Sequence, residues 1–368
     1  MSEVLEGFTI GVAADRRSEE QLSLLTGRGA TCIHGPTMRT HALRPEGEIA
    51  SATRAVIAAR PQVVVANTGI GTRGWIEAAS ATGLGDELRA VLAAARVVAR
   101  GPKAHGAAVA EGVAVDWTAP DATSASVLQH ITNTTEPGSP VAVQNDGGPD
   151  EPLAEALRLH GYPTVTVPVY RWSLPADVGP AEVLVRAIVE GRVDAVTFTA
   201  APQIDNLMAI ATAIDLGGGV ATAFRSTVLP VCVGEVCAAR AHDRDFGDAL
   251  VPTRPRLGAM VQTLTDALVA TARPFRLAGQ DLDLRGRTVF GGDEAVMLTG
   301  RERDTLLALL ERPGSVRSKQ DLLGRVWGAA ATDTHVVEVT VGRLRRRLGT
   351  AGEGIETVMR RGYRASPE

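Results

Sequence analysis

The sequence predicts an α/β protein with a parallel-sheet module in two lobes, followed by a C-terminal winged helix-turn-helix domain. Three observations predict this fold. Short apolar strands alternate with amphipathic helices from about residue 7 to residue 270, which is the pattern of a parallel sheet. Similar strand-to-helix turns recur in both halves of that region. A helix rich in arginine then precedes a basic β-hairpin near the C-terminus.

The first module begins with a strand–helix–strand unit. Phe8 to Ala14 is a short apolar strand, Glu19 to Arg28 an amphipathic helix, and Cys32 to His34 the next strand. Such a unit is typical of a parallel sheet. The same pattern predicts further strands at residues 63–66, 97–99, 113–115, 141–144, 165–167, 195–198 and 228–233, with helices between them.

Two kinds of turn occur twice. Residues 65–69 and 197–201 each end a strand and open a helix, and residues 100–105 and 233–238 form a second such pair. This recurrence indicates two similar lobes. The alternative is a general likeness of strand-to-helix loops, because these loops commonly use small residues.

One helix near the C-terminus is predicted to bury one face and expose a basic one. The apolar residues are spaced to share a face; they are Val337, Val341, Leu344 and Leu348. The residues roughly opposite are His335, Val339, Arg343 and Arg346. A strand over 355–358, a turn that ends at Gly362 and a returning strand follow. A guanidinium-rich helix face suits the major groove of duplex DNA, although the helix by itself also fits an ordinary solvated surface.

Charge is distributed unevenly along the chain. The net charge is -4, but residues 283–368 hold 15 basic and 12 acidic side chains, a balance of +3. The other residues hold 23 and 30, a balance of -7. The last part should therefore attract nucleic acid and the first part repel it.

Composition also excludes several classes of protein. The chain has no apolar run of membrane length and no basic N-terminal region, so we expect a cytoplasmic protein without a membrane partner. The three cysteines and seven histidines have no ligand spacing, which predicts reduced thiols and no metal site. No P-loop, nucleophile elbow or Rossmann fingerprint is present, so no cofactor is expected.

Residues from about 280 to 366 resemble the effector domain of OmpR/PhoB response regulators. The matching segments, in order, are residues 298–302, 306–310, 313–316, 321–328, 343–348 and 357–363. Within them Thr299 and Glu302 have the spacing of a capping box, and Gly362 is expected to let the wing turn tightly. The resemblance implies double-stranded DNA as the partner and binding to paired half-sites as a homodimer.

The same resemblance implies which residues meet DNA. The positions that would face a groove or a phosphate are His335, Thr340, Arg343, Arg345, Arg346, Thr357, Arg360 and Arg361. Arg343 is the expected base contact, because arginine pairs bidentately with guanine. Met359 replaces an arginine of the family's wing, so that contact is expected to shift to Arg360 and Arg361. No receiver domain precedes this region, so control by a ligand or partner is expected.

Residues from about 7 to 270 resemble uroporphyrinogen-III synthase, which cyclises hydroxymethylbilane. The matching segments are Arg16, residues 153–161, 167–170, 198–200 and 233–238. The resemblance implies one lobe from residues 1–37 plus 172–272 and a second from 42–168. A linker over 273–281 and the winged helix over 282–368 complete the expected division.

The synthase resemblance also implies a tetrapyrrole ligand in a cleft between the lobes. Carboxylates of such a ligand suit helix N-termini, hydroxyls and arginine at the ends of strands. The implied ligand-binding residues are Arg16, Thr68, Gly69, Thr199, Ala200 and Gly234, and Tyr170 would be the catalytic residue of an active enzyme. A linker tyrosine packed between lobes is the alternative for Tyr170, and a solvated surface charge is the alternative for Arg16.

Several positions depart from the synthase pattern. Ala200 replaces a serine, Val236 and Cys237 replace hydroxyl residues, and Ala104 lies at the equivalent turn of the other lobe. Glu235 adds a negative charge where an anionic ligand should approach. Because each lost polar contact costs roughly 1 kcal/mol, we expect inefficient catalysis.

The sequence is compatible with two functions. The favoured one is a transcription regulator in which the synthase-like module senses a ligand or partner. This domain order is similar to that of regulators of nitrate and nitrite assimilation in high-GC bacteria, which implies a link to sirohaem and joint action with a second nitrogen regulator. The alternative is a working uroporphyrinogen-III synthase with a DNA-binding appendage.

Overall fold

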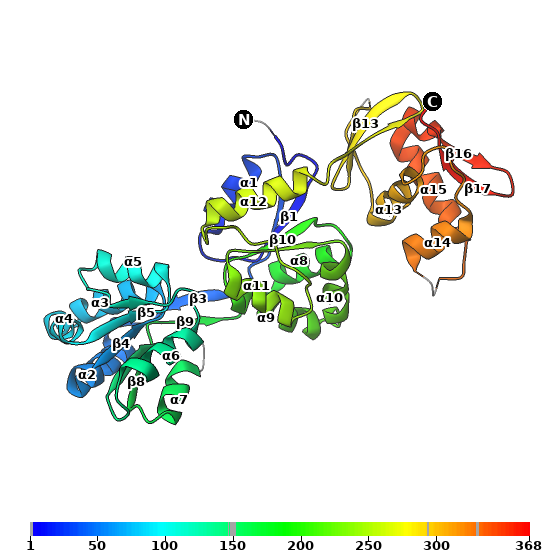
Figure 1. Ribbon diagram of the computed structural model, residues 1–368. Coiled ribbons are helices and arrows are strands. Elements are labelled where there is room, and N and C mark those ends of the chain that lie inside the picture. Colours follow the sequence, from blue (N-terminus) through cyan, green and yellow to red (C-terminus); the bar gives the residue numbers. More distant parts are fainter. Residues whose placement is uncertain (1–2, 146, 148–151, 293, 329–330) are drawn as a thin grey trace. The chain divides into compact units, whose positions relative to one another are not determined.

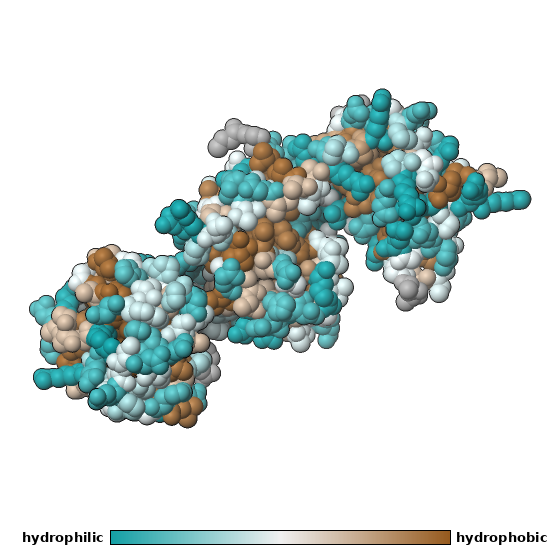
Figure 2. Space-filling model, in the orientation of Figure 1, coloured by the Kyte–Doolittle hydropathy of each residue, from teal (hydrophilic) through white to brown (hydrophobic). Residues whose placement is uncertain are grey.

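The computed structural model describes residues 3–145, 147, 152–292, 294–328 and 331–368. The chain divides into two compact units (Figure 1). One unit consists of Met1–Thr37 and Pro175–Glu368, and the other of Met38–Leu174. The first unit contains lobe one and the C-terminal domain, and the second unit is lobe two. Figure 2 shows hydrophobic residues on the visible surface in patches among hydrophilic ones.

Lobe one is built on a four-stranded parallel sheet in the order β11-β10-β1-β2. The strands are β1 (Thr9–Val12), β2 (Thr31–His34), β10 (Ala195–Phe198) and β11 (Leu229–Cys232). The helices are α1 (Ser18–Thr26), α8 (Gly179–Val189), α9 (Ala201–Ala213), α10 (Gly217–Ser226), α11 (Glu235–Asp243) and α12 (Leu257–Val269). Every residue of the central strands β1 and β10 is buried, which explains their continuous apolar sequences.

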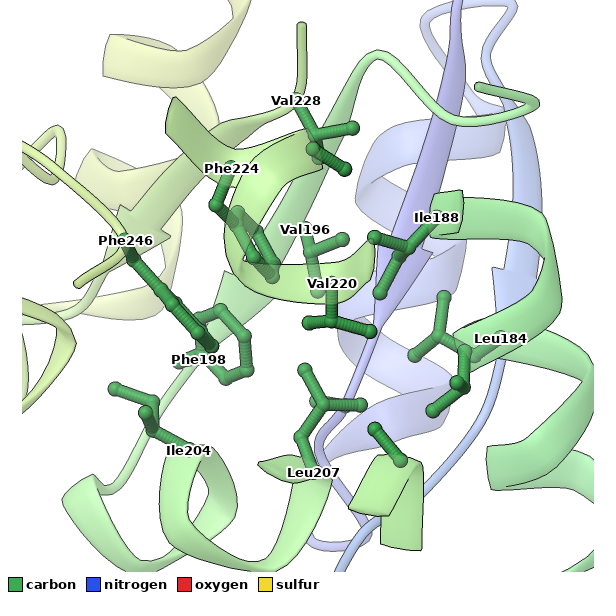
Figure 3. Packing of buried hydrophobic residues seen from close by; sticks show 14 of the residues in the cluster. Leu184, Ile188, Val196, Phe198, Ile204, Leu207, Val220, Phe224, Val228 and Phe246 are labelled. Carbon is green, nitrogen blue, oxygen red and sulfur yellow. The ribbon is translucent and has the colours of Figure 1, made fainter. Parts of the chain in front are cut away.

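Two apolar clusters fill the two faces of this sheet. One joins β1 and β11 to α1 and α12. Figure 3 shows the other, in which side chains from α8, α9 and α10 meet those of β10. The aromatic rings of Phe224 and Phe246 stack there with their centroids 4.0 Å apart, and Phe198 packs against both. Three aromatic rings therefore supply bulk in a chain that is poor in aromatic residues.

Lobe two contains a five-stranded parallel sheet in the order β6-β5-β4-β7-β8. The strands are β4 (Val63–Ala66), β5 (Arg96–Ala99), β6 (Trp117–Thr118), β7 (Val141–Gln144) and β8 (Thr164–Val167). The helices are α2 (Ala50–Ala59), α3 (Gly69–Ala81), α4 (Gly85–Ala94), α5 (Pro102–Ala110), α6 (Ser124–Thr134) and α7 (Pro152–Leu159), with a π-helical turn η1 at Pro45–Ile49. The antiparallel pair β3 (Arg39–Ala42) and β9 (Tyr170–Ser173) lies at the ends of this unit.

The strand predicted at 113–115 is wrong. After α5 the chain reverses at Gly112, whose φ is +77°, and pairs with β5 only at Trp117 and Thr118. Val113 is nevertheless buried, so its apolar side chain reflects core packing rather than a strand.

The C-terminal domain begins with a four-stranded antiparallel sheet. Its strands are β12 (Arg273–Leu277), β13 (Gln280–Arg285), β14 (Thr288–Phe290) and β15 (Val296–Met297). The helices α13 (Gly300–Leu310), α14 (Lys319–Trp327) and α15 (His335–Leu348), a 3-10 turn η2 (Gly349–Gly354) and the hairpin β16 (Ile355–Val358) and β17 (Gly362–Ala365) follow. This order is that of a winged helix-turn-helix domain, as predicted.

The segment 273–281, which we expected to be a linker, instead forms β12 and the start of β13. Leu277 and Leu282 from these strands are buried in the same cluster as the three helices. Because these two side chains are part of the domain core, β12 and β13 belong to the C-terminal domain. The domain therefore starts at Arg273.

Two local predictions in this domain concern the start of α13 and the turn of the wing. The capping box is confirmed, because Thr299 Oγ1 accepts from Glu302 N–H at 3.3 Å and Glu302 Oε2 accepts from Thr299 N–H at 2.8 Å. Gly362, at the end of the wing turn, has φ +133°, a conformation that favours glycine, as predicted, and Arg360 in the same turn has φ +59°. A side chain at Gly362 would in addition overlap the carbonyl of Arg317. Glycine at position 362 thus allows the wing to approach the start of α14.

Candidate nucleic-acid interface and ligand-binding rims

The lobe-one rim is the carboxyl-terminal edge of the lobe-one sheet, with Arg16, Thr199, Ala200 and Gly234. Strands β1, β10 and β11 are parallel and in register, so their ends lie along one edge. Arg16 follows β1, Thr199 and Ala200 follow β10, and Gly234 follows β11. The structure therefore brings the expected residues of lobe one to the same edge of the sheet.

The N-terminus of α9 at this rim is closed by the protein itself. Gln203 Oε1 accepts from Thr199 N–H at 2.7 Å and from Ala200 N–H at 3.2 Å. Ala200 has no side-chain oxygen that could accept from the first turn of the helix, and the buried Gln203 side chain instead binds the two N–H groups that precede the helix. These two backbone donors, which would otherwise suit a carboxylate, are already satisfied.

The first turn of α11 also lacks hydroxyl donors. The helix starts at Gly234 without a side-chain cap, and Glu235 and Val236 are exposed. Cys237 is buried, with Sγ 3.8 Å from the carbonyl oxygen of Phe198. The neighbouring Cys232 thiol, together with burial, raises the pKa of Cys237, which disfavours its thiolate form. The turn presents a carboxylate and an apolar side chain to solvent.

Arg16 is the cation of the lobe-one rim. It is exposed between β1 and α1 and makes no hydrogen bond or ion pair with the residues that the structure describes. The adjacent Arg17 differs, because its guanidinium pairs with Glu20 at 2.7 Å. Arg16 is therefore the arginine of this turn that is available to an anion.

The lobe-two rim is the corresponding edge of the lobe-two sheet, where Thr68 and Gly69 begin α3 and Gly101 begins α5. Thr68 Oγ1 caps α3 by accepting from Gly71 N–H at 3.1 Å. A Cβ at Gly69 would lie 2.5 Å from the carbonyl oxygen of Lys103. Gly69 is thus required for the close packing of α3 on α5, a reason other than the ligand contact that we expected.

Tyr170 lies in the same unit as the lobe-two rim. It is the first residue of β9, pairs with Ala42 of β3, and its half-buried ring packs against the apolar cluster of lobe two. A side chain at Gly147 would overlap this ring. Tyr170, Thr68 and Gly69 belong to one unit, whereas the residues of the lobe-one rim belong to the other.

The recognition face is the exposed side of α15, made of His335, Val339, Thr340, Arg343 and Arg346. The opposite side is buried in the domain core, as the spacing of Val337, Val341, Leu344 and Leu348 predicted. Asp333 Oδ1 accepts from His335 N–H at 2.8 Å at the start of the helix. All residues of the recognition face except Arg346 line a groove of about 490 Å³, together with Thr299, Arg301, Glu302, Trp327, Val336 and Arg347.

The four arginines of α15 have two different roles. Arg343 is exposed and has no partner among the described residues, and Arg346 is exposed with one long contact to its own helix. Arg347 instead reaches Glu302 at 3.1 Å and the carbonyl of Met297 at 2.9 Å. Two guanidiniums, those of Arg343 and Arg346, therefore extend outward without a strong partner among the described residues.

Arg345 and Thr357, both expected at the DNA, bind each other. Arg345 Nη2 donates to Thr357 Oγ1 at 2.9 Å and Nε donates to the carbonyl of Ile355 at 2.6 Å. Its guanidinium also lies 5.6 Å from the ring centroid of Tyr363. These contacts connect the recognition helix to the wing, which is a structural role.

The remaining expected residues lie on two parts of the domain. Arg360 and Arg361 are exposed with Met359 at the tip of the wing. Thr340 is half-buried, and its hydroxyl donates to the carbonyl of Val336 at 2.8 Å.

One neighbour of the recognition face was not predicted from the sequence. Lys319 of α14 pairs with Glu338 of α15, and this hydrogen bond lowers the pKa of Glu338. His335 Nδ1 lies 3.4 Å from the same carboxylate. The ion pair with Lys319 thus offsets the negative charge of Glu338. The sequence gives little indication of this pair, because the two residues are far apart in the chain.

Two absences apply to the described ranges only. They contain no group of three or more His, Cys, Asp and Glu side chains able to hold a metal ion. They also contain no helix whose length and apolar character would let it span a bilayer.

Comparison with known proteins agrees with both parts of this architecture. The family described as uroporphyrinogen-III synthase HemD matches residues 20–262, and the C-terminal domain of transcriptional regulatory proteins matches residues 293–365. The uncharacterized protein YjjA of Bacillus subtilis is 25% identical over 264 residues, which are 72% of this chain and 97% of YjjA. The transcriptional regulatory protein PrrA of Mycobacterium tuberculosis is 29% identical over 227 residues, 58% of this chain and 88% of PrrA.

A solved structure supports the fold of the module. A mutant uroporphyrinogen III synthase from Thermus thermophilus is similar with a TM-score of 0.61 and 30% identity, covering 71% of this chain and 98% of the synthase. The chain thus belongs to the uroporphyrinogen-III synthase HemD family and carries a C-terminal DNA-binding domain of the OmpR/PhoB type found in transcription regulators.

Proposed function

We propose that the HemD-like module is a sensor that controls transcription through the C-terminal domain. The observation that carries this proposal is the contrast between the recognition face, where Arg343 and Arg346 point outward without strong partners, and the lobe-one rim, where Gln203 occupies the backbone donors. The DNA-binding part keeps the groups that its function needs. The synthase-like part has lost several of the groups that hold a flexible polyanion.

The proposed DNA contacts follow from exposure. Arg343 pairs with guanine in the major groove, because arginine offers two parallel donors to guanine N7 and O6. Arg346 binds the phosphate backbone, and His335 and Thr340 lie on the same exposed side of α15. Arg360 and Arg361 of the wing add backbone contacts. Arg345 and Thr357 support these contacts by joining the helix to the wing.

The proposed ligand is a tetrapyrrole that carries several carboxylates. Arg16 offers an unpaired guanidinium, and the uncapped start of α11 at Gly234 offers backbone N–H groups. In lobe two, the N-terminus of α3 at Thr68 and Gly69 is a second, separate region that would bind carboxylates of the ligand. A protein can bind such a ligand without turning it over, because only interactions that strengthen in the transition state accelerate the reaction.

The regulated process is proposed from the domain order, which is similar to that of regulators of nitrate and nitrite assimilation. Sirohaem, the cofactor of nitrite reductase, is itself a tetrapyrrole, so a tetrapyrrole sensor suits such genes. The protein would bind paired half-sites as a homodimer and act together with a second nitrogen regulator. Deleting the gene should change transcript levels of nitrite reductase in cells grown on nitrate, and unchanged transcripts would separate the regulator from this process.

The second candidate function is uroporphyrinogen-III synthesis. It is favoured by the match of the family over residues 20–262 and by the presence of Tyr170 at the start of β9. In an active enzyme the Tyr170 hydroxyl would assist departure of the leaving hydroxyl of hydroxymethylbilane. The substituted residues Ala200 and Glu235 argue against efficient turnover.

The sensor function is tested by measuring DNA and ligand binding together. Full-length protein is titrated onto promoter fragments from the neighbourhood of its own gene, with and without uroporphyrin III, a stable octacarboxylate. We expect specific binding whose affinity changes when the ligand is present, in the range of about 5- to 150-fold that is typical of allosteric coupling. Ligand-insensitive binding, with no uroporphyrin bound to the module, would contradict the sensor role.

A further inference from the structure

Within the first unit, the sheet of the C-terminal domain contacts the amino-terminal edge of the lobe-one sheet. Thr288 Oγ1 of β14 donates to the carbonyl of Gly7 at 3.4 Å, just before β1. Arg287 Nη2 donates to the carbonyl of Arg192 at 3.4 Å, just before β10. Both contacts join residues far apart in the chain, so they bring the two domains together at the start of the two central strands.

Asp194 lies at the centre of this contact. Its Oδ2 accepts from Thr9 N–H at 2.8 Å, which ties the entry of β10 to the entry of β1. A Cβ built on Gly286 of the C-terminal domain would lie 2.8 Å from the same oxygen. Burial raises the pKa of Asp194, while Arg303 and Arg287 of the C-terminal domain act in the opposite direction. The carboxylate therefore responds to the charges of the neighbouring domain.

Glycines on both sides allow the close approach. Gly7 has φ +92°, and a Cβ there would lie 2.8 Å from the ring of Phe290 and 3.0 Å from the carbonyl of Arg285. Gly286 has φ +56°, and a Cβ there would also lie 2.9 Å from the carbonyl of Gly7. Since neither site has room for a side chain, the fit depends on both glycines.

The contact lies at the opposite end of the same strands from the lobe-one rim. β1 starts at Thr9 and leads toward Arg16, and β10 starts directly after Asp194 and ends at Phe198, just before Thr199. Strands of this length span about 13 Å, and all of their residues are buried. Two rigid, buried strands thus connect the rim to the C-terminal domain.

We propose that Gly7, Arg192 and Asp194 form a docking seat for the winged-helix domain, and that β1 and β10 couple this seat to the lobe-one rim. The seat fits the turn Arg285–Thr288 of the same chain. The docking itself is independent of any ligand, whereas the coupling rests on the proposed sensor function. Ligand binding at the rim shifts the ends of β1 and β10 and so changes how firmly the winged-helix domain is held.

The docking is tested with a matched pair of glycine substitutions in the full-length protein. Gly286→Asn places a Cβ against Asp194, whereas Gly279→Asn adds the same side chain at another positive-φ turn of the same sheet, where nothing lies within 4 Å. Asparagine tolerates this backbone conformation better than most residues, so both variants should fold. We expect Gly286→Asn to increase the radius of gyration in small-angle scattering and to speed hydrogen exchange of the β1 and β14 amides. Gly279→Asn should match the wild type.

A second substitution keeps this test decisive. Asp194→Ala removes the carboxylate that the new side chain would meet, so the variant with both changes should regain part of the compact scattering profile. Identical profiles and exchange rates for the Gly286 and Gly279 variants would overturn the docking seat. Loss of fold in both variants would show as loss of far-ultraviolet dichroism, and the comparison then rests on Asp194→Ala, which should speed exchange of the β14 amides of the C-terminal domain; the β1 amides do not serve here, because Asp194 also accepts from Thr9 N–H within lobe one. Unchanged exchange in that variant would also overturn the seat.

The coupling is tested with uroporphyrin III as the probe. Direct binding to the module is followed by absorbance, and DNA affinity is measured for the wild type and for Gly286→Asn. We expect the probe to bind both proteins equally but to change DNA affinity only in the wild type. Equal changes in both proteins would overturn the coupling and leave the sensor function intact. Absence of probe binding in both would contradict the sensor function while the scattering result still decides the docking.

Discussion

The lobe-one rim contains the start of a helix, and the recognition face is one side of a helix. Both features suit anions, but their hydrogen-bond donors are used differently. At the rim, Gln203 accepts from the N–H groups of Thr199 and Ala200. At the recognition face, Arg343 and Arg346 extend into solvent. This difference shows that the backbone geometry of a binding site can persist while its hydrogen-bond donors are used in contacts within the protein. Donors that are hydrogen-bonded within the protein contribute to its stability, whereas exposed donors without such a bond are available to a ligand.

A charge difference strengthens this comparison. Glu235 stands exposed in the first turn of α11, where the helix dipole favours a negative charge. The same dipole would favour a carboxylate of a ligand, so the side chain competes with it. On α15, in contrast, the described acidic residue Glu338 is paired with Lys319. The negative charge of Glu338 is therefore offset by a neighbouring cation.

The largest expected effect concerns Arg343. Arg343→Ala should weaken specific DNA binding by about 1–3 kcal/mol and relax sequence preference at one base pair, because a bidentate contact to guanine is lost. Fluorescence anisotropy with operator and scrambled duplexes measures both quantities. Equal affinity of mutant and wild type for the operator would remove Arg343 from the interface.

The matched control is Arg345 on the same helix. Arg345→Ala removes hydrogen bonds to Thr357 and to the carbonyl of Ile355. Hydrogen bonds of charged groups contribute about 1.5–3 kcal/mol, so we expect a loss of stability of that size in urea unfolding. Its DNA affinity should fall only to the extent that the wing loosens. An unchanged midpoint with a strong loss of base preference would reverse the roles of the two arginines.

A smaller effect is expected at the rim. Gln203→Ala removes the oxygen that caps α9, and loss of a helix cap costs about 0.5–2 kcal/mol. The freed N–H groups of Thr199 and Ala200 should at the same time bind a carboxylate ligand more tightly. Thermal unfolding and uroporphyrin titration measure the two changes. Stability that falls without any gain in ligand affinity would argue that these donors do not face the ligand.

The smallest effect concerns Glu235. Glu235→Gln removes a negative charge near the start of α11, which should improve binding of a polyanion by about 0.3–1 kcal/mol at low ionic strength. The gain should disappear as salt is added, because exposed charges are screened. A gain that persists in high salt would point to a cause other than charge.

Much of the fold was predictable because its signals are local. Continuous apolar segments such as Val63–Ala66 predicted buried parallel strands, and the spacing of Val337, Val341 and Leu344 predicted the buried side of α15. The failures also have physical causes. Residues 273–281 mix polar and apolar side chains without a clear period and include Pro274 and Gly279, a pattern typical of a linker, although they form a short hairpin. Val113 is apolar because it packs in the core, although it lies in a loop.

The candidate site was only partly predictable. Positions at the ends of strands could be read from the sequence, so Arg16 and Thr199 lie at one edge as expected. Whether a side chain is available depends on tertiary contacts, and neither the engagement of Arg345 with Thr357 nor the capping by Gln203 follows from residue type alone. A signal for the latter existed, because glutamine three residues after a cap position has the capping-box spacing.

The distinction between a sensor and a catalyst is tested most directly by incubating the full-length protein with hydroxymethylbilane. This substrate closes spontaneously to the type I isomer of uroporphyrinogen. The account predicts that type I dominates and that the type III isomer stays near the level without protein. Type III formation at ordinary enzyme turnover, about 1–10³ per second, would contradict it and make the module a working synthase.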